Sequence, residues 1–278
     1  TKSNSPVFFC GLAMTLDLRQ NVWSLFPATV EWILTNQKLT TSPMTGALTK
    51  PIKLTIIVPV LNEVNLLAEF MSHIRQQWSK PQELLIIDGG SSDGSWEWLQ
   101  THYKKSSYQT NSGRGRQMNF GVQKASKKWL YFLHIDSRLP KDFDLVLSNA
   151  IHTGVRWGCF RLKFNQANWL LRQAAAGSRW NHPLCRGGDQ SLFISKKDFD
   201  SLGGYDTRYA VCEDIHLIKK LYALGGFKVL PEYISTSSRR FYQNGVIRLL
   251  FHFGIMHLSH WLGAGPQFLH RYYLKFIR

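Results

Sequence analysis

Short apolar segments alternate with amphipathic segments through the middle of the chain. Residues 54–61, 84–87 and 129–135 are nearly continuous apolar runs, which is typical of strands buried on both faces of a parallel sheet. Between the first two runs, apolar residues recur at helical spacing from Leu66 to Trp78. Because strands that alternate with helices form right-handed βαβ units, the pattern predicts an α/β fold with a mainly parallel central sheet flanked by helices.

The same alternation continues to about residue 230. A second helix is expected to begin near Ser95. Further helices are predicted over residues 114–124, 143–151, 168–180, 198–202 and 213–224, and further strands over residues 157–164, 191–194 and 227–230. Together these elements are enough for one large α/β domain.

The two ends of the chain differ in composition from this central part. Residues 1–50 contain one stretch with helical periodicity (23–34) and a linker rich in Thr, Ser, Pro and Gly (39–51), and we assign them no function. Residues 246–278 are aromatic, basic and largely helical in pattern. We therefore predict an N-terminal extension and linker (1–50), one large α/β domain (51–245) and an amphipathic, basic, helical C-terminal tail (246–278).

The charge balance restricts the partners. The formal net charge is +16, from 34 Lys and Arg against 18 Asp and Glu, which indicates anionic partners such as nucleic acid, phosphorylated ligands or an anionic membrane surface. The positive residues form no block and are interleaved with aromatic residues near the C-terminus. This spread favours a membrane surface over nucleic acid. The alternative is a C-terminal tail that packs on the rest of the protein and does not contact a membrane.

The hydropathy and the cysteines predict the compartment. No apolar run approaches the roughly 18 residues that span a bilayer. The four cysteines are far apart and form no C-x-x-C pair, which argues against a zinc site or a disulfide framework and favours a reducing environment. We therefore predict a cytoplasmic protein, with peripheral contact to the inner face of the membrane left open.

Acidic side chains follow three of the predicted strands. These side chains are Glu63, Asp88, Asp93 and Asp136. In open α/β sheets, ligands bind beyond the carboxyl ends of the strands. Gly90 is one of two glycines after Asp88, where a ligand can approach the backbone closely, and Asp136 with nearby Arg138 suits a divalent cation that holds a phosphorylated substrate. The alternative, for Asp93 above all, is a turn or helix cap in which the carboxylate accepts bonds from its own backbone.

A second acidic feature, Glu213-Asp214, opens the helix predicted at residues 213–224. Adjacent carboxylates at this position are stabilised by the helix dipole, so helix capping is one interpretation. A general base that takes a proton from an acceptor hydroxyl is the other. Arg239 and Arg240 could neutralise a leaving diphosphate, or they could form a solvated basic pair. The chain lacks both G-x-G-x-x-G after the first strand and G-x-x-x-x-G-K-[ST], which argues against a dinucleotide site and a P-loop.

Seven motifs, taken in order, resemble the family 2 glycosyltransferases of GT-A fold. They are I-I-V-P-V-L-N-E (56–63), I-I-D-G-G-S-S-D-G-S (86–95), G-R-G-R-Q-M-N-F-G (113–121), F-L-H-I-D-S-R-L-P (132–140), G-D-Q-S-L-F (188–193), C-E-D-I-H-L-I-K-K-L (212–221) and S-S-R-R-F (237–241). The resemblance covers about residues 54–245. The third, fifth and seventh motifs resemble more closely a bacterial subgroup associated with radical-SAM and selenodomain proteins.

The resemblance implies an inverting transfer of a sugar from a nucleotide-diphosphate donor, a UDP- or GDP-sugar, to an acceptor hydroxyl. It implies that Asp214, in the Glu213-Asp214 pair, is the catalytic base and that Asp136 holds Mg²⁺ or Mn²⁺. The donor-binding residues that it implies are Pro59, Asn62, Glu63, Asp88, Gly90, Asp93, Arg114, Gln117, Asp136, Arg138, Arg239 and Arg240. Those implied on the acceptor side are Gly188, Asp189 and Gln190.

Two departures from the family pattern modify these expectations. His134 stands where the family's D-x-D has its first Asp, so we expect a metal site that is completed largely by the donor diphosphate. The Q-x-x-R-W motif of processive members is absent, so we expect transfer of a single sugar. The acceptor is left open, and a lipid or hydrophobic acceptor is one option.

Two other functions remain as alternatives. One is a nucleotidyltransferase-like enzyme, which would need a Gly-rich basic loop after the first strand. The other is a basic membrane-binding or nucleic-acid-binding protein with a vestigial site. Because the chain has no basic stripe, nucleic acid is not expected as a partner.

Overall fold

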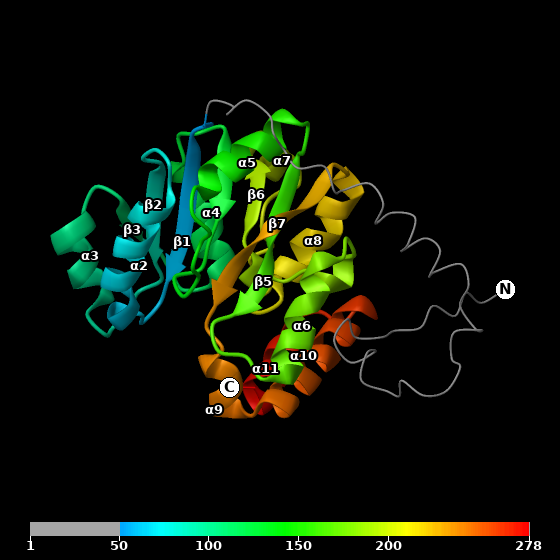
Figure 1. Ribbon diagram of the computed structural model, residues 1–278. Helices are drawn as coiled ribbons and strands as arrows, with labels where there is room; N and C mark the ends of the chain where they lie inside the picture. The colour runs from blue at the N-terminus through cyan, green and yellow to red at the C-terminus, as the bar shows by residue number, and fades with distance from the viewer. Residues whose placement is uncertain (1–50, 278) are drawn as a thin grey trace.

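A computed structural model describes residues 51–277 (Figure 1). Predictions for residues 1–50, including the helix over 23–34 and all but the last residue of the linker over 39–51, lie outside the described residues. The strands are β1 (Leu54–Val60), β2 (Glu83–Asp88), β3 (Ser107–Gln109), β4 (Trp129–Phe132), β5 (Trp157–Phe164), β6 (Leu192–Ser195) and β7 (Phe227–Thr236). The helices are α2 (Val64–Gln77), α3 (Ser95–Tyr103), α4 (Arg114–Lys124), α5 (Phe143–His152), α6 (Trp169–Ala176), α7 (Lys196–Ser201), α8 (Glu213–Leu224), α9 (Arg239–Asn244), α10 (Val246–Trp261) and α11 (Pro266–Phe276).

The described strands form one sheet in the order β3-β2-β1-β4-β6-β5-β7. The pairs among β1, β2, β3 and β4 are parallel, as is the β5–β7 pair, whereas β6 runs antiparallel to both β4 and β5. The predicted α/β fold with a mainly parallel sheet and flanking helices is therefore confirmed.

Alternation along the strands builds a core on each side of the sheet. Ile56 and Val58 of β1 face one side, where they pack with residues of α2, α3 and α5. Ile57, between them in the chain, faces the other side and packs with residues of α4, α7 and α8. Because both faces are covered by helices, the strands must be apolar at successive positions, which explains their nearly continuous hydrophobic runs.

The strand ends differ from the prediction in ways that affect the candidate site. β4 ends at Phe132 rather than at Ile135, and residues 134–137 form a turn closed by the Ser137 N–H, which donates to the His134 carbonyl at 3.1 Å. β7 extends to Thr236, well beyond the predicted end at residue 230. The predicted helix over 168–180 divides into α6 and a 3₁₀ turn, Gly177–Arg179. The early end of β4 frees the side chains after it from the sheet.

The C-terminal segment is helical, as the pattern predicted. α10 packs on α6, α9 and α11, and these helices lie together below the sheet in Figure 1. Leu249, Met256 and Leu269 form a small core with Tyr209 and Val211, which precede α8. Within residues 51–277, no helix has the length and apolar character needed to cross a membrane.

Candidate active site

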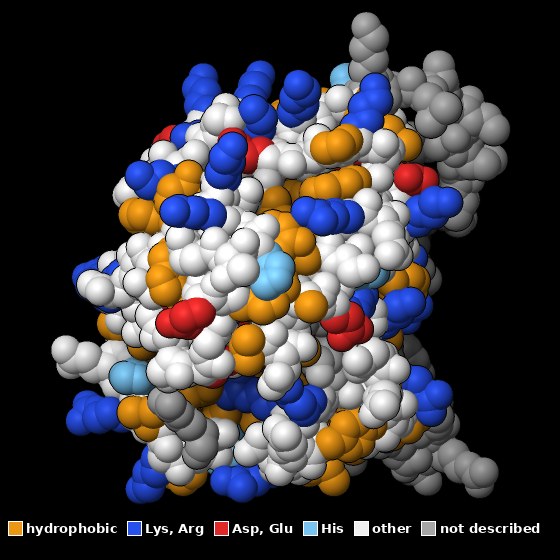
Figure 2. Space-filling view, turned by 90° about the vertical axis from the view of Figure 1, so that its left-hand side faces the viewer, with side chains coloured by type: hydrophobic (Ala, Val, Ile, Leu, Met, Phe, Trp, Pro, Cys, Tyr) orange, Lys and Arg blue, Asp and Glu red, His pale blue; other side chains and the backbone are white. Residues whose placement is uncertain are grey.

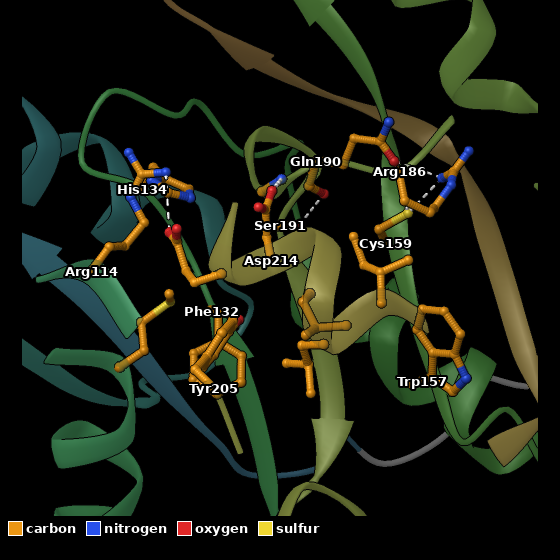
Figure 3. A pocket seen from close by; sticks show the side chains of 17 residues that line it. Arg114, Phe132, His134, Trp157, Cys159, Arg186, Gln190, Ser191, Tyr205 and Asp214 are labelled. Atoms are coloured by element: carbon orange, nitrogen blue, oxygen red, sulfur yellow. Dashed lines mark hydrogen bonds and ion pairs between the residues drawn. The ribbon is translucent and has the colours of Figure 1, made fainter. Parts of the chain in front are cut away.

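The first candidate site is a pocket at the carboxyl ends of the strands, which we call the central pocket. It is lined by the beginning of α4, the turn after β4, the loop before β6 and the beginning of α8. Figure 3 shows Arg114 and His134 on one side of it, Arg186 and Cys159 on the other, and Asp214 between them. Residues that are far apart in the chain therefore meet around one carboxylate.

Asp214 is held in place by backbone donors. The Gly188 N–H donates to Oδ2, and the Ile215 N–H donates to Oδ1 at 2.9 Å. A Cβ atom added to Gly188 would lie 3.1 Å from Asp214 Oδ2 and 3.3 Å from His134 Nε2, so a larger residue would press on these two side chains. A carboxylate fixed in this way, and half-buried at the pocket, is suited to accept a proton from a hydroxyl.

Glu213 is almost fully buried beside Asp214, with 3% of its side chain exposed. Its Oε1 lies 3.6 Å from Arg114 Nη1 and has no hydrogen-bond partner within the described residues. The pKa of Glu213 is raised to about 7, mainly by burial; the Arg114 guanidinium opposes the rise and the Asp214 charge adds to it. Glu213 can therefore change its charge near neutral pH.

The backbone before this pair is unusual. Cys212, the residue before α8, has φ +62°, a left-handed conformation that is rare for a residue with a side chain and common near functional sites. This turn starts α8 at the pocket, so that the first two helical residues are both carboxylates of the site.

His134 is a neutral side chain in this pocket. Burial and the nearby Arg114 charge lower the pKa of His134 to about 3, against the opposing effect of Asp214. At neutral pH it therefore offers uncharged ring nitrogens rather than the negative charge that an aspartate would bring.

A second pocket, which we call the Asp136 pocket, lies beside Asp136, Arg138, Thr236 and Arg239. The Thr236 hydroxyl donates to Asp136 Oδ2 at 3.3 Å. Burial raises the pKa of Asp136, and the charge of Asp189 raises it further. A cation here would stabilise the ionised form of Asp136, since it would compensate the buried charge and reduce the repulsion between the two carboxylates.

The Asp136 pocket also carries arginines. Arg138 forms an ion pair with Glu69, and Arg239 Nη2 lies 3.9 Å from Glu63 Oε2. Burial raises the pKa of Glu63, while the Arg239 charge opposes the rise. These exposed or partly exposed pairs are weak, so an incoming diphosphate can compete for the guanidinium groups.

The oxygen donors present fit a small divalent site. Within residues 51–277, no three His, Cys, Asp or Glu side chains form a cluster that could hold a metal ion. Asp136 and the exposed Asp189 are nevertheless close enough to affect each other's charge. Mg²⁺ is commonly bound by one or two carboxylates together with substrate phosphates, and this is the kind of site that these residues can provide.

Several residues with predicted donor contacts also make hydrogen bonds that hold the local fold. Asp88 is fully buried and accepts from the Gly90 N–H at 2.8 Å, the Ser91 N–H at 3.0 Å and Gln109 Nε2 at 3.0 Å. Asp93 accepts from the Val64 N–H at 3.0 Å, at the first residue of α2. The turn-and-cap interpretation therefore describes the carboxylates of both residues in this structure.

Other predicted donor residues also make structural contacts. Gln117 Nε2 donates to the Val60 carbonyl at 2.8 Å and to the Ile87 carbonyl at 2.7 Å, which joins the ends of β1 and β2. Asn62 accepts from the Ser92 N–H at 2.8 Å. Pro59 lies within β1, opposite Ile87 of β2. These residues shape the edge of the sheet and are absent from the linings of both pockets.

Arg240 and Gln190, two further predicted site residues, form contacts within the protein. Arg240 donates to the Tyr273 hydroxyl, and its guanidinium lies 5.6 Å from the Phe253 ring centre, so it joins α9 to α10 and α11 rather than lining the Asp136 pocket. Gln190 lines the central pocket, but its amide accepts from Arg186 Nη1 at 2.6 Å and donates to the Cys185 carbonyl. Its polar atoms are thus used to hold the loop.

Sequence reasoning missed Arg186 and Thr236. Arg186 is 4% exposed and donates to Ser178 O at 2.7 Å and to Cys159 Sγ at 2.9 Å. Only its place next to Gly187-Gly188 in a polar loop could have indicated a role. Thr236 was missed because the polar end of β7 has no apolar pattern.

Comparison with known proteins identifies the family of the chain. A family model described as "Glycosyl transferase family 2" matches residues 55–201. An "Uncharacterized glycosyltransferase" of Rickettsia felis is 34% identical over 95 residues, which are 32% of this chain and 16% of that protein. A "PGL/p-HBAD biosynthesis glycosyltransferase" of Mycobacterium bovis is 26% identical over 182 residues, 57% of this chain and 65% of that protein. The chain thus spans less than two thirds of the length of these curated relatives.

Solved structures share the fold. A mannosyltransferase from Pyrobaculum calidifontis, in complex with GDP-Man and Mn²⁺, has a TM-score of 0.61 at 19% identity, over 88% of this chain and 76% of its own. S. aureus TarS 1–349, in complex with UDP-GlcNAc, has a TM-score of 0.56 at 16% identity, over 77% and 72%. At these identities the likeness establishes the GT-A-type fold.

Proposed function

The chain belongs to glycosyl transferase family 2, and from this premise we propose that it transfers one sugar from a nucleotide-diphosphate donor to an acceptor hydroxyl with inversion at the anomeric carbon. The single observation that carries the proposal is the fixed carboxylate of Asp214 in the central pocket, close to the Asp136 pocket with its arginines. A base and a diphosphate site are the two parts that such a displacement needs.

The proposed reaction begins with Asp214. Its carboxylate takes the proton of the acceptor hydroxyl while the acceptor oxygen attacks the anomeric carbon. The bond from that carbon to the donor phosphate oxygen breaks, and the nucleoside diphosphate leaves with the bonding electron pair. Direct attack from the face opposite the leaving group inverts the configuration. The Gly188 and Ile215 N–H groups keep the carboxylate oriented throughout.

Glu213 and Arg114 are proposed to set the charge around the base. When Glu213 is ionised, it and Arg114 form a nearly neutral pair, at 3.6 Å. When Glu213 is protonated, Arg114 leaves a net positive charge beside the base.

The donor diphosphate is proposed to lie in the Asp136 pocket. Arg138 and Arg239 would exchange their weak carboxylate partners for phosphate oxygens, with which arginine makes strong charge-assisted hydrogen bonds. Asp136, together with Asp189, would hold Mg²⁺ or Mn²⁺. When bound, the ion would supply positive charge that stabilises the departing diphosphate. Structural neighbours in complex with GDP-Man and with UDP-GlcNAc support a GDP- or UDP-sugar as the donor.

Single-sugar transfer and membership of the radical-SAM-associated subgroup are also proposed. Both rest on sequence motifs: the missing Q-x-x-R-W and the presence of G-R-G-R-Q-M-N-F-G, G-D-Q-S-L-F and S-S-R-R-F. A nucleotidyltransferase is not supported, because the segment after β1 is Leu61-Asn62-Glu63 and leads directly into α2 without a glycine-rich basic loop.

The test is the substitution Asp214→Asn. Without a base, the release of nucleoside diphosphate from UDP- or GDP-sugars in the presence of a lipid-extract acceptor mixture is expected to fall by about 10²–10⁴-fold. Nucleotide binding, measured by titration calorimetry with UDP and GDP, is expected to stay within about threefold, since Asp214 does not line the Asp136 pocket. Unchanged turnover would refute the assignment of the base.

A further inference from the structure

The C-terminal helices expose an unusual number of large apolar side chains. On α10 and the residue directly after it, Ile247 and Leu262 are each 71% exposed, and Phe251 and Trp261 are each 59% exposed. On α11, Phe268 and Leu274 are also exposed, at 49% and 44%. Ile247 and Phe251 are four residues apart and thus on the same side of α10. Such a concentration of exposed apolar residues marks an interaction surface rather than ordinary scatter.

The same helices carry only positive charge. No Asp or Glu occurs between residues 233 and 278, whereas this stretch contains exposed basic residues on α10 and α11, among them Arg248, Arg271 and Lys275. Figure 2 shows Lys and Arg side chains interspersed with hydrophobic ones along the lower edge of the molecule, where these helices lie in Figure 1. A partner that covers this surface must therefore be both anionic and apolar.

The helices are attached firmly to the rest of the protein. Their small core includes Tyr209, Val211 and Cys212, the residues that lead into α8. His257 of α10 is near enough to the pair at the start of α8 for the Asp214 charge to act on its pKa, which burial lowers. Anything bound to the exposed side of α10 and α11 is therefore held next to the central pocket.

These features distinguish between the candidate occupants. A second copy of the chain would bring two surfaces of the same positive charge together, which costs free energy unless the charges are compensated. An anionic bilayer surface offers phosphate groups to the basic side chains and an apolar boundary to the aromatic and aliphatic ones, which is the binding mode of amphipathic interfacial helices. Tryptophan is also favoured at the level of the lipid headgroups.

We propose that the exposed side of α10 and α11, which we call the docking face, binds the surface of an anionic lipid bilayer. It is defined by Ile247, Phe251, Trp261, Leu262, Phe268 and Leu274, with Arg248, Arg271 and Lys275. Docking in this way keeps the helices in the plane of the membrane surface and places the central pocket within reach of a hydroxyl carried by a lipid-linked acceptor.

The test is co-sedimentation of the full chain with vesicles of phosphatidylcholine, with and without phosphatidylglycerol. Strong binding is expected only to the vesicles that contain phosphatidylglycerol. Phe251→Ser with Trp261→Ser is expected to weaken binding at least tenfold. Arg271→Gln with Lys275→Gln is expected to weaken it about fivefold for each charge removed. Because these side chains are exposed, thermal unfolding should be unchanged in both double variants.

The matched control is Lys104→Gln with Lys105→Gln. It removes the same charge from exposed positions at the end of α3, far from the docking face (Figure 1), and binding should stay within about twofold. The proposal is overturned if the wild type ignores anionic vesicles, if it binds both vesicle types equally, or if the control weakens binding as much as Arg271→Gln with Lys275→Gln. It is also overturned if Phe251→Ser with Trp261→Ser dissociates an oligomer in analytical ultracentrifugation, since a second copy would then occupy the face. No nucleotide or sugar is present, so the result is independent of the proposed activity.

Discussion

At the scale of single residues, Gly188 shows how closely the central pocket is built around Asp214. A methyl group there would meet Asp214 Oδ2 at 3.1 Å and His134 Nε2 at 3.3 Å, whereas at Gly187 it would meet nothing within 4 Å. Gly188→Ala should therefore displace the base and lower turnover by about 10- to 100-fold, with little change in the melting temperature. Gly187→Ala is the control and should keep the turnover and the melting temperature of the wild type. Equal activity of the two variants would contradict the proposed position of the base.

Glu213 gives a prediction for the pH dependence of stability. Its pKa is about 7 in the folded protein, and burial is the main cause, against about 4.5 in an unfolded chain. Between these two values the folded state binds a proton that the unfolded state does not, so the contribution of Glu213 to stability decreases as the pH rises from about 4.5 to 7. Glu213→Gln cannot ionise, and it should gain stability relative to the wild type over this window.

The measurement is chemical denaturation of both proteins at pH 5, 6, 7 and 8. The variant's advantage is expected to grow with pH by a few kcal/mol in total, since one pKa unit corresponds to about 1.4 kcal/mol. The two proteins should behave most alike at the acid end. A difference that is constant from pH 5 to pH 8 would show that Glu213 ionises normally.

The predicted carboxylates divide into two groups for a physical reason. Sequence could place Asp88, Asp93 and Asp136 after strands, but it could not show which backbone donors lie nearby. Asp88 and Asp93 meet N–H groups that fold back onto them. Within residues 51–277, Asp136 accepts from the Thr236 hydroxyl and from its own turn, and the charge of Asp189, in a distant loop, raises its pKa. The first two carboxylates therefore already have several hydrogen bonds within the protein, whereas Asp136 has fewer, and their predicted contacts with the donor stay predictions.

At the scale of elements, periodicity predicted those whose burial is regular. The helix over residues 114–124 and the strand over residues 157–164 have the predicted bounds in the structure, because each has its apolar residues at the spacing of its own geometry. β3 was missed because it is three residues long and gains its stability from pairing with β2. The polar end of β7 was missed because it is fixed by pairing with β5, up to Phe164 opposite Thr236.

The ends of β4 and β7 matter because the Asp136 pocket lies where the pairing of these strands ends. β4 stops at Phe132, where its register with β1 reaches Ile57, and the chain then turns through His134 and Asp136. The extended β7 brings Ser235 alongside Arg138 and Thr236 within hydrogen-bonding distance of Asp136. The Asp136 pocket is thus a consequence of two strand ends that local sequence does not determine.

At the scale of the whole molecule, two of the proposed binding surfaces share in the positive charge of the chain, which has a formal net charge of +16. Part of it faces the Asp136 pocket through Arg138 and Arg239, and part lies on the docking face, where the final 46 residues contain no carboxylate. The same charge that attracts an anionic donor therefore also orients the protein toward an anionic surface. These two surfaces give the positive charge a role without a nucleic-acid-binding stripe.

A ligand that binds the folded protein alone must stabilise the whole chain, and this gives a test of the donor site. At a concentration of one hundred times its Kd, UDP or GDP should stabilise the protein by about 2.7 kcal/mol, which for a domain of this size is a rise of about 5–10 °C in melting temperature. Addition of Mn²⁺ should enlarge the rise, because the ion would link the diphosphate to Asp136 and Asp189.

Asp136→Asn isolates the contribution of the metal. The variant should keep the rise in melting temperature with nucleotide alone and lose the additional rise with Mn²⁺, because one of the two carboxylates proposed to hold the ion is gone. Asp200→Asn, at an exposed position on α7, is the control and should behave as the wild type. A larger shift with duplex DNA than with either nucleotide diphosphate would favour the nucleic-acid-binding alternative, since the stabilising ligand would then bind the protein's general positive charge rather than the Asp136 pocket.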